Sequence, residues 1–198
     1  IGYQTVGFYS ETFFTDFKGR DYYYRPKNVS PYFIQVLLRN TALSVIFNSK
    51  IYDWHRDTIS FALDTLPEVT SLEGPQFALA HILCPHPPFV FNSDGTPREA
   101  KRVYAVHDAN RFLHDGTIEE YRTGYKNQVT YLQDEILNMV DRIQQKSTKP
   151  FILILQGDHG PGSETDQDKA GVSNATERHG ILYAVYFFDM DYTRLYAK

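Results

Sequence analysis

The chain has 198 residues, and its 20 Lys and Arg residues against 24 Asp and Glu give a formal net charge of −4. This balance argues against a nucleic-acid-binding protein, which usually carries a basic face. The single cysteine, Cys84, excludes an internal disulfide and a cysteine-rich zinc module. No apolar run reaches the 18 residues that a membrane-spanning helix needs. The length suits one domain with a substantial core, and we expect residues 1–198 to form it.

The first half of the chain predicts two helices and one strand around an aromatic-rich loop. Residues 3–9 are apolar enough for a strand, and residues 13–26, which include three consecutive tyrosines, are expected to form the loop. Residues 33–38 have the pattern of a helix. A second, amphipathic helix is predicted over residues 57–66 and should end before Pro67, because a proline disfavours helix in the residue that precedes it.

The second half alternates buried strands with a long helix. Residues 76–83 form a nearly continuous apolar run and predict a buried strand. From Tyr125 to Ile143 the apolar positions step by three and four, which indicates a long helix with one buried stripe. Residues 151–155 and 181–188 lack polar alternation and are typical of strands inside a parallel sheet covered by helices. The chain is therefore predicted to be α/β, with a mostly parallel sheet and helices on both faces.

An Asp-His pair follows the predicted strand 151–155. Ligands bind at the carboxyl ends of strands in open parallel sheets, and Asp158 and His159 lie at such an end. A carboxylate oxygen beside an imidazole nitrogen suits Zn or Mn better than Ca or Mg. The alternative is an ordinary turn in which Asp158 caps the following segment, and the residue types alone do not separate the two.

The other histidines have weaker contexts. His81 lies within an apolar run, which favours a core histidine with one hydrogen bond. His86 stands among prolines beyond the strand and could face the same cleft as Asp158. Cys84 is expected to be a buried small side chain and not a nucleophile. Three further histidines are expected on the surface or in structural roles: His55, His107 and His114.

The segment before the final strand offers two more candidates. Arg178 could bind a phosphate or sulfate through two parallel hydrogen bonds, and His179 could be a ligand or an acid–base group. The alternative is a solvated loop with a helix cap. The acidic residues Glu164, Asp166 and Asp168 lack the glycine and distal glutamate of an EF-hand, which favours a solvated loop.

Two segments together resemble a known family. Residues 74–89, which contain Cys84-Pro85-His86-Pro87-Pro88, and residues 125–161, which end in Gln156-Gly157-Asp158-His159-Gly160-Pro161, resemble membrane-anchored sulfatase-like proteins of the alkaline phosphatase superfamily. Lipoteichoic acid synthases and phosphoethanolamine transferases are relatives in that superfamily. The resemblance extends from about residue 1 to residue 188. It implies a metal-dependent site for a phosphate or sulfate ester, carried on a lipid or glycan.

The resemblance also assigns roles to residues. Asp158 and His159 match the metal-binding pair, His86 matches a histidine that lines the substrate cleft, and Arg178 and His179 match substrate-binding positions loosely. The metal is expected to be Zn or Mn, with Ca as the alternative. The metal would lower the pKa of a nucleophile that attacks the ester and forms a covalent intermediate.

The family's nucleophile and first acidic ligand have no counterpart in this sequence, which contains no Cys-x-Pro-x-Arg motif. We therefore expect the carboxy-terminal part of a sulfatase-like domain whose sheet is incomplete at its amino-terminal side. Alone it should be inactive and bind metal weakly. The parent protein would be anchored by upstream transmembrane helices and would act outside the cytoplasm.

Two alternatives stay open. The chain could be a non-catalytic domain whose aromatic-rich first fifty residues bind glycans or lipid headgroups, although His86, Asp158 and His159 together favour an enzyme. The sequence does not discriminate a sulfatase from a phosphotransferase. An exposed sheet edge also invites pairing with another copy, so self-association is a further expectation.

Overall fold

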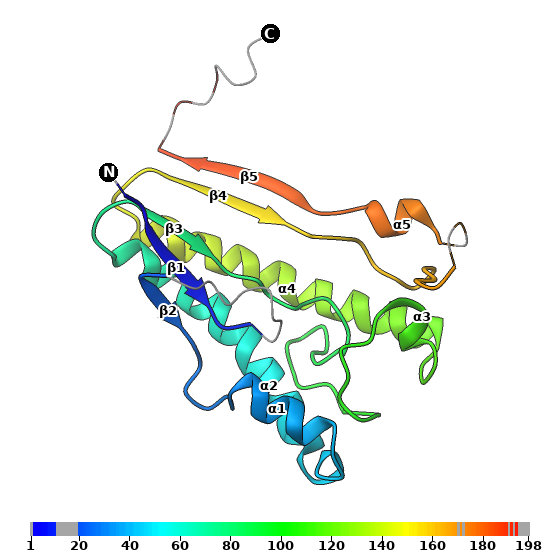
Figure 1. Ribbon diagram of the computed structural model, residues 1–198. Coiled ribbons are helices and arrows are strands. Elements are labelled where there is room, and N and C mark those ends of the chain that lie inside the picture. Colours follow the sequence, from blue (N-terminus) through cyan, green and yellow to red (C-terminus); the bar gives the residue numbers. More distant parts are fainter. Residues whose placement is uncertain are drawn as a thin grey trace.

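The computed structural model describes residues 2–10, 20–169, 171, 173–189, 191 and 193. Its strands and helices are interspersed along the chain (Figure 1). In chain order they are β1 (Gln4–Phe8), β2 (Tyr22–Tyr24), α1 (Tyr32–Arg39), α2 (Ser44–Thr65), the 3-10 helix η2 (Leu66–Ser71), β3 (Gln76–Leu79), α3 (Ala109–Phe112), α4 (Ile118–Lys146), β4 (Phe151–Gln156), α5 (Ala175–His179) and β5 (Tyr183–Phe188). The predicted α/β class is confirmed.

Three strands form a parallel sheet in the order β2-β1-β3. Its inner face carries Val6 and Phe8 of β1, which pack against Val69 of η2. The prediction of a loop over residues 13–26 is wrong for Tyr22–Tyr24, which is strand β2, and residues 13–19 lie outside the described part. The strand forms because its aromatic side chains fit the pleated surface, as the stacking of Tyr24 on Phe8 at 5.3 Å between ring centroids shows.

Strands β4 and β5 form a separate, antiparallel pair. We expected both inside a parallel sheet, and this prediction is wrong because the chain turns back through the loop and α5 at the far end of β4 (Figure 1). Phe151, Leu153 and Leu155 pack against the helical core, but Ile152 and Ile154 on the other face are 52% and 56% exposed. The outer face of this pair therefore lacks the helical cover that we predicted.

The main core lies between β4 and the two long helices, α2 and α4. Helix α4 confirms the predicted periodicity, with Leu132, Met139 and Ile143 buried, although Val129 from the same predicted stripe is 39% exposed. The helix begins where Thr117 accepts a hydrogen bond from the Glu120 N–H at 3.1 Å. Helix α2 ends at Thr65 as predicted, but it begins at Ser44, thirteen residues earlier than the predicted start at residue 57.

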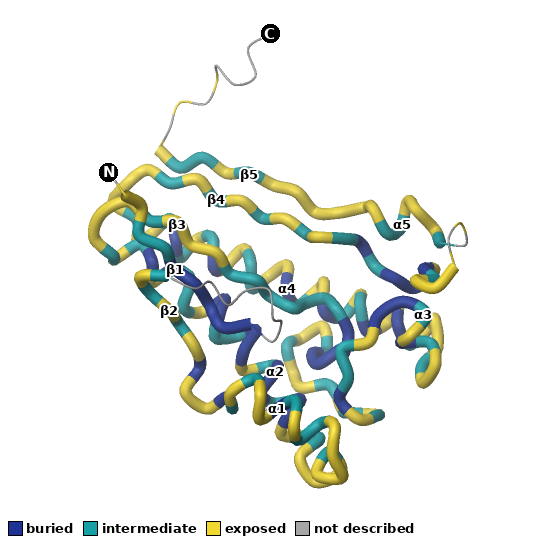
Figure 2. The backbone as a smooth tube through the Cα atoms, viewed as in Figure 1, coloured by how far each residue is buried: buried dark blue, intermediate teal, exposed yellow. Residues whose placement is uncertain are grey.

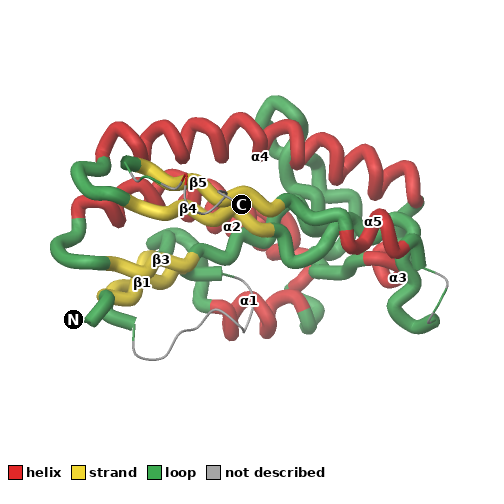
Figure 3. Tube along the Cα trace, turned by 90° about the horizontal axis from the view of Figure 1, so that it is seen from above, coloured by secondary structure: helices red, strands yellow, loops and turns green. Residues whose placement is uncertain are grey.

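Strand β3 is shorter and more open than the predicted buried strand over residues 76–83. It ends at Leu79, and Phe77 is 58% exposed. Among the described strands, β3 pairs only with β1 and β4 pairs only with β5, so each has one edge without a partner strand. In the view of Figure 3, β4 and β5 lie between α4 on one side and β1 and β3 on the other. None of the described helices is both long and apolar enough to cross a bilayer.

Candidate functional site

Three segments that are distant in sequence bring two imidazoles and a carboxylate together. His86 lies in the loop after β3, Asp108 directly precedes α3, and His159 lies in the loop after β4. One potential ligand atom from each of these side chains lies within 4.8 Å of the other two. The rings of His86 and His159 are 6.2 Å apart between centroids. The loops after β3 and β4 therefore bring their histidines to the same cluster.

Backbone carbonyls determine which ring nitrogen carries the proton in both histidines. Nδ1 of His86 lies 2.5 Å from the Pro87 carbonyl oxygen, and Nδ1 of His159 lies 2.9 Å from the Gly160 carbonyl oxygen. A carbonyl oxygen only accepts, so Nδ1 is the donor in each ring. In the neutral form each Nε2 therefore keeps a lone pair, which is the arrangement that metal-ligating histidines commonly have.

Asp108 is held in the site by two side-chain donors. Its carboxylate accepts a hydrogen bond from the Tyr121 hydroxyl at 2.6 Å and another from Nη1 of Arg178 at 2.7 Å. The Asp108 side chain is only 5% exposed. Burial acts to raise the pKa of Asp108, but the bonds from Tyr121 and Arg178 oppose it and the net pKa is lowered. Asp108 is therefore a buried carboxylate held in its charged form.

In His86, burial has a larger effect on the pKa than the neighbouring charge. Burial lowers its pKa, and the negative charge of Asp108 opposes that shift only partly. A buried imidazole disfavours the charged form because the interior solvates a cation poorly. His86 is therefore held as a neutral ring with an available nitrogen, the form in which histidine binds a metal or accepts a proton.

Two glycines let the loop after β4 approach its neighbours closely. A Cβ atom on Gly160 would lie 2.0 Å from the Glu177 carbonyl oxygen in α5, and one on Gly162 would lie 3.0 Å from an Asp108 carboxylate oxygen. Gly160 N–H donates to the Arg178 carbonyl at 2.7 Å, and Gly162 N–H donates to the Tyr121 hydroxyl at 2.8 Å. The space beside these glycines is therefore filled by α5 and Asp108 and is not open to a bound group.

A buried glutamine in α4 positions the loop that carries His86. The side-chain oxygen of Gln128 accepts from the N–H groups of Val90 at 2.6 Å and Phe91 at 3.3 Å. Its amide group lies 3.5 Å from the His86 carbonyl oxygen. Gln128 is fully buried, so these bonds satisfy polar groups that would otherwise be costly to bury.

The other candidate residues from the sequence analysis lie at different distances from this cluster. The Asp158 side chain is 78% exposed and lies 3.6 Å from Nε2 of His159. It accepts a hydrogen bond from the His159 backbone N–H at 3.0 Å, so it also makes the local turn contact that we considered as the alternative. Arg178 lies inside the site through its bond to Asp108. His179 is exposed, and no contact joins it to the cluster in the described structure.

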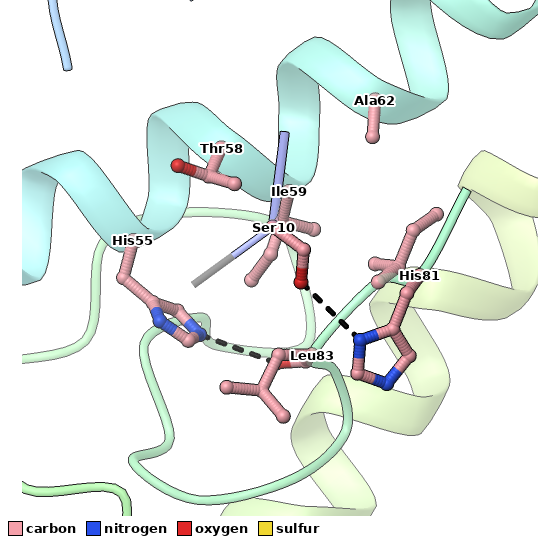
Figure 4. Close-up of a pocket in the computed structure, with 8 residues that line it drawn as sticks. Ser10, His55, Thr58, Ile59, Ala62, His81 and Leu83 are labelled. Atoms are coloured by element: carbon pink, nitrogen blue, oxygen red, sulfur yellow. Dashed lines mark hydrogen bonds between the residues drawn. The ribbon is translucent and has the colours of Figure 1, made fainter. Parts of the chain in front are cut away.

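The remaining predicted side chains have structural roles. His81 lies 3.2 Å from the Ser10 hydroxyl, and His55 is buried, 3.2 Å from the Leu83 carbonyl oxygen (Figure 4). Burial raises the pKa of Cys84, which agrees with an inert thiol. His107 and His114 are exposed. Glu164 forms an ion pair with Arg122 on the surface, as expected for a solvated loop.

Asp108 and Tyr121 are the site residues that the sequence did not reveal. Asp108 precedes a four-residue helix, where an aspartate usually suggests a helix cap, yet its side chain makes no cap hydrogen bond. Tyr121 lies near the start of α4 and extends the helix's buried face. Neither residue carries a distinct sequence signal, because only the packing of α3, α4 and the loop after β4 brings them together.

Comparison with protein-family models identifies one family. The family model described as Sulfatase matches residues 1–186. No curated protein and no solved structure matches the chain. The family match covers most of the 198 residues and includes all three segments that carry the cluster. The chain therefore belongs to the Sulfatase family.

Proposed function

We propose that this chain forms part of a metal-dependent hydrolase or transferase of sulfate or phosphate esters. The observation that supports this function best is the convergence of His86, Asp108 and His159 from three separate loops. A group of imidazoles and a buried carboxylate brought together from separate loops is typical of catalytic sites. Family membership favours ester chemistry over other reactions at such a site.

The donor set fits a transition metal. His86 and His159 both donate from Nδ1 to backbone carbonyls, and Asp158 adds an exposed carboxylate beside His159. Nitrogen and oxygen donors in this combination suit Zn or Mn, with Ca as the alternative. We propose that Asp158 and His159 bind the metal. When bound, the metal would polarise the ester and neutralise charge on the transferring group.

The neighbouring residues would handle the ester itself. Arg178 is fixed by hydrogen bonds from Nη1 to Asp108 and to the Gly160 carbonyl oxygen. A guanidinium held in this way supplies positive charge to an anionic group without losing side-chain freedom on binding. His86 would line the substrate cleft, and His179 would contact more distant parts of the substrate. The ester would be carried on a lipid or a glycan.

We further propose that the nucleophile is supplied from outside these 198 residues, and that the whole protein is anchored in the membrane and acts outside the cytoplasm. This proposal rests on the resemblance, which assigns the role of nucleophile to none of the 198 residues. The chain alone should therefore bind metal weakly and hydrolyse neither aryl sulfates nor aryl phosphates. The free edges of β3 and β4 also support self-association, which light scattering at high protein concentration would test.

Metal binding tests the proposed site without requiring turnover. Calorimetric titration of the chain with Zn or Mn should give one weak site, and His159→Gln should weaken it by about tenfold or more. The matched control is His114→Gln, since His114 is exposed outside the cluster. Equal weakening by both variants, or unchanged binding in His159→Gln, would contradict the proposed metal site.

Turnover separates the enzyme from the alternative, a non-catalytic domain that binds glycans or lipid headgroups. The longer protein that contains this chain should cleave an aryl phosphate or aryl sulfate, and Asp158→Ala should abolish the activity. Relative rates on the two esters would identify the transferred group. Activity of the 198-residue chain that survives Asp158→Ala would show that the assigned residues are not the catalytic ones.

A further inference from the structure

The end of the molecule formed by α1 and the start of α2 exposes a group of large apolar side chains. Figure 1 places this end away from the β4–β5 pair, and Figure 2 shows that much of its surface is exposed. We call it the apolar tip. Its members are between 38% and 80% exposed: Phe33, Ile34, Leu37, Leu43, Val45 and Ile46.

Helix α1 packs Leu38 against the core but leaves other apolar side chains exposed. Its buried residue is polar: Gln35 is 2% exposed and donates hydrogen bonds to the Tyr9 hydroxyl at 3.1 Å and the Ser30 carbonyl at 2.9 Å. Its apolar residues Phe33 and Leu37, one helical turn apart, are 72% and 48% exposed. Soluble proteins rarely expose contiguous apolar surface of this kind unless it binds something.

The charge around the apolar tip indicates what it binds. The sequence from Tyr22 to Tyr52 contains no Asp or Glu, in a chain that has 24 of them, but contains four cations. These are Arg25, Lys27, Arg39 and Lys50, and none of them forms an ion pair with a carboxylate among the described residues. The segment therefore has a net charge of +4 within a protein of net charge −4.

Three of the four cations contact aromatic rings or a carbonyl instead of carboxylates. Arg39 lies 5.5 Å from the Tyr32 ring centroid, and Lys50 lies 6.0 Å from that of Trp54. Arg25 donates to the Val29 carbonyl at 2.9 Å. Contacts of this kind leave the positive charge available to a partner, because they do not neutralise it.

We propose that the apolar tip binds the surface of an anionic lipid bilayer. An exposed apolar helix face flanked by Lys and Arg is the pattern of helices that lie in a membrane interface. The apolar side chains would enter the boundary between headgroups and acyl chains, and the cations would contact anionic headgroups. Each cation near such a surface strengthens binding by about fivefold. The inference does not depend on the proposed function, because lipid binding requires no turnover.

Vesicle flotation with the whole chain tests this proposal. The two probes are vesicles of phosphatidylcholine and vesicles in which about a third of the lipid is phosphatidylglycerol. The chain should bind the anionic vesicles at least about tenfold more tightly, and added salt should weaken that binding because it screens the attraction. Equal binding to both vesicles, or binding to neither, would overturn the proposal.

Two variants and a matched control assign the binding to the apolar tip. Phe33→Ser combined with Ile46→Ser removes one aromatic and one aliphatic side chain, each 72% exposed, and should weaken binding by about tenfold or more. Tyr183→Ser combined with Ile154→Ser makes the matched change on the outer face of β4 and β5, where the two residues are 61% and 56% exposed, and should leave binding unchanged.

The second variant alters charge alone, so it stays informative if the apolar substitutions disturb folding. Lys27→Gln combined with Lys50→Gln should weaken binding to anionic vesicles by about tenfold or more and leave binding to neutral vesicles unchanged. Circular dichroism would confirm that each variant is folded. If the apolar variant instead dissociates a dimer and the wild type binds no vesicles, the tip is an interface between copies and the lipid proposal is wrong.

Discussion

The hydroxyl of Tyr121 offers the sharpest test of how the site is built. Tyr121 is 1% exposed, and its hydroxyl donates to Asp108 at 2.6 Å and accepts from Gly162 N–H at 2.8 Å. Tyr121→Phe keeps the ring, which packs against Phe89 and Phe112 at centroid distances of 5.3 and 5.2 Å. The substitution therefore removes two hydrogen bonds and almost no apolar contact.

The expected loss of stability follows from those two bonds. A hydrogen bond to a charged group contributes about 1.5–3 kcal/mol, and a buried N–H without a partner costs about 1–3 kcal/mol. The two effects share one oxygen and are not additive, so we expect Tyr121→Phe to lower the free energy of unfolding by about 2–4 kcal/mol. Urea denaturation followed by circular dichroism measures this quantity, and the slope against denaturant concentration should stay unchanged.

The control is one turn further along the same helix. Tyr125 stacks on Tyr121, with ring centroids 6.2 Å apart and an interplanar angle of 11°. Within the described residues its hydroxyl makes no hydrogen bond, so Tyr125→Phe should change stability by less than about 0.5 kcal/mol. Equal destabilisation by the two variants would refute the view that the hydroxyl links Asp108 to the loop after β4.

Three further predictions test separate features. Gly160→Ala should destabilise the fold by about 1–3 kcal/mol in urea denaturation, because its Cβ would overlap backbone atoms of α5, whereas Gly157→Ala should be nearly neutral because its nearest contacts are at 3.7 Å or more. Cys84 should resist a thiol reagent in the native protein and react on unfolding, because burial raises its pKa; rapid native labelling would contradict this. Lys146→Gln should cost less than about 1 kcal/mol, because the Lys146–Glu68 ion pair is exposed on both sides.

The sequence predicted helices best where apolar residues recur at helical spacing among polar residues. Helix α4 was predicted because its apolar residues repeat every three or four positions, and this repeat includes the buried Met139 and Ile143. Helix α1 was found for the same reason, although its apolar residues Phe33 and Leu37 face outward. The pattern identifies the helix from its period, but it does not identify the side of the helix that meets the core.

The predicted parallel pairing of β4 was wrong for a related reason. A continuous apolar run such as Phe151 to Leu155 is expected for a central parallel strand, but an antiparallel strand with an exposed apolar face has the same sequence. The direction of β5 depends on how the chain returns through α5, and no local pattern records that path. Tyr22–Tyr24 was likewise predicted as loop, because three aromatic residues beside charged ones carry no period.

Among the residues of the candidate site, some were suggested by their position in the sequence and one was not. Asp158 and His159 stand next to each other after a strand, so sequence position alone suggested them. His86 was suggested by its place among prolines. Asp108 was not, because its role depends on contacts with Tyr121 and Arg178, which lie 13 and 70 positions further along the chain.

Charge balance within the site indicates how the two aspartates divide their roles. Asp108 is buried and paired with Arg178, so its negative charge is already balanced by one positive charge. A divalent cation bound close to Asp108 would lie near that guanidinium, and the two would repel by about 8 kcal/mol at a separation of about 4 Å and an effective dielectric of 20. Asp158 has no such partner among the described residues and lies beside His159. We therefore expect the metal to lie towards Asp158 and His159, and Asp158→Asn to weaken metal binding despite the exposure of this residue, while Asp108 and Arg178 hold the opposite wall of the site for an anionic ester.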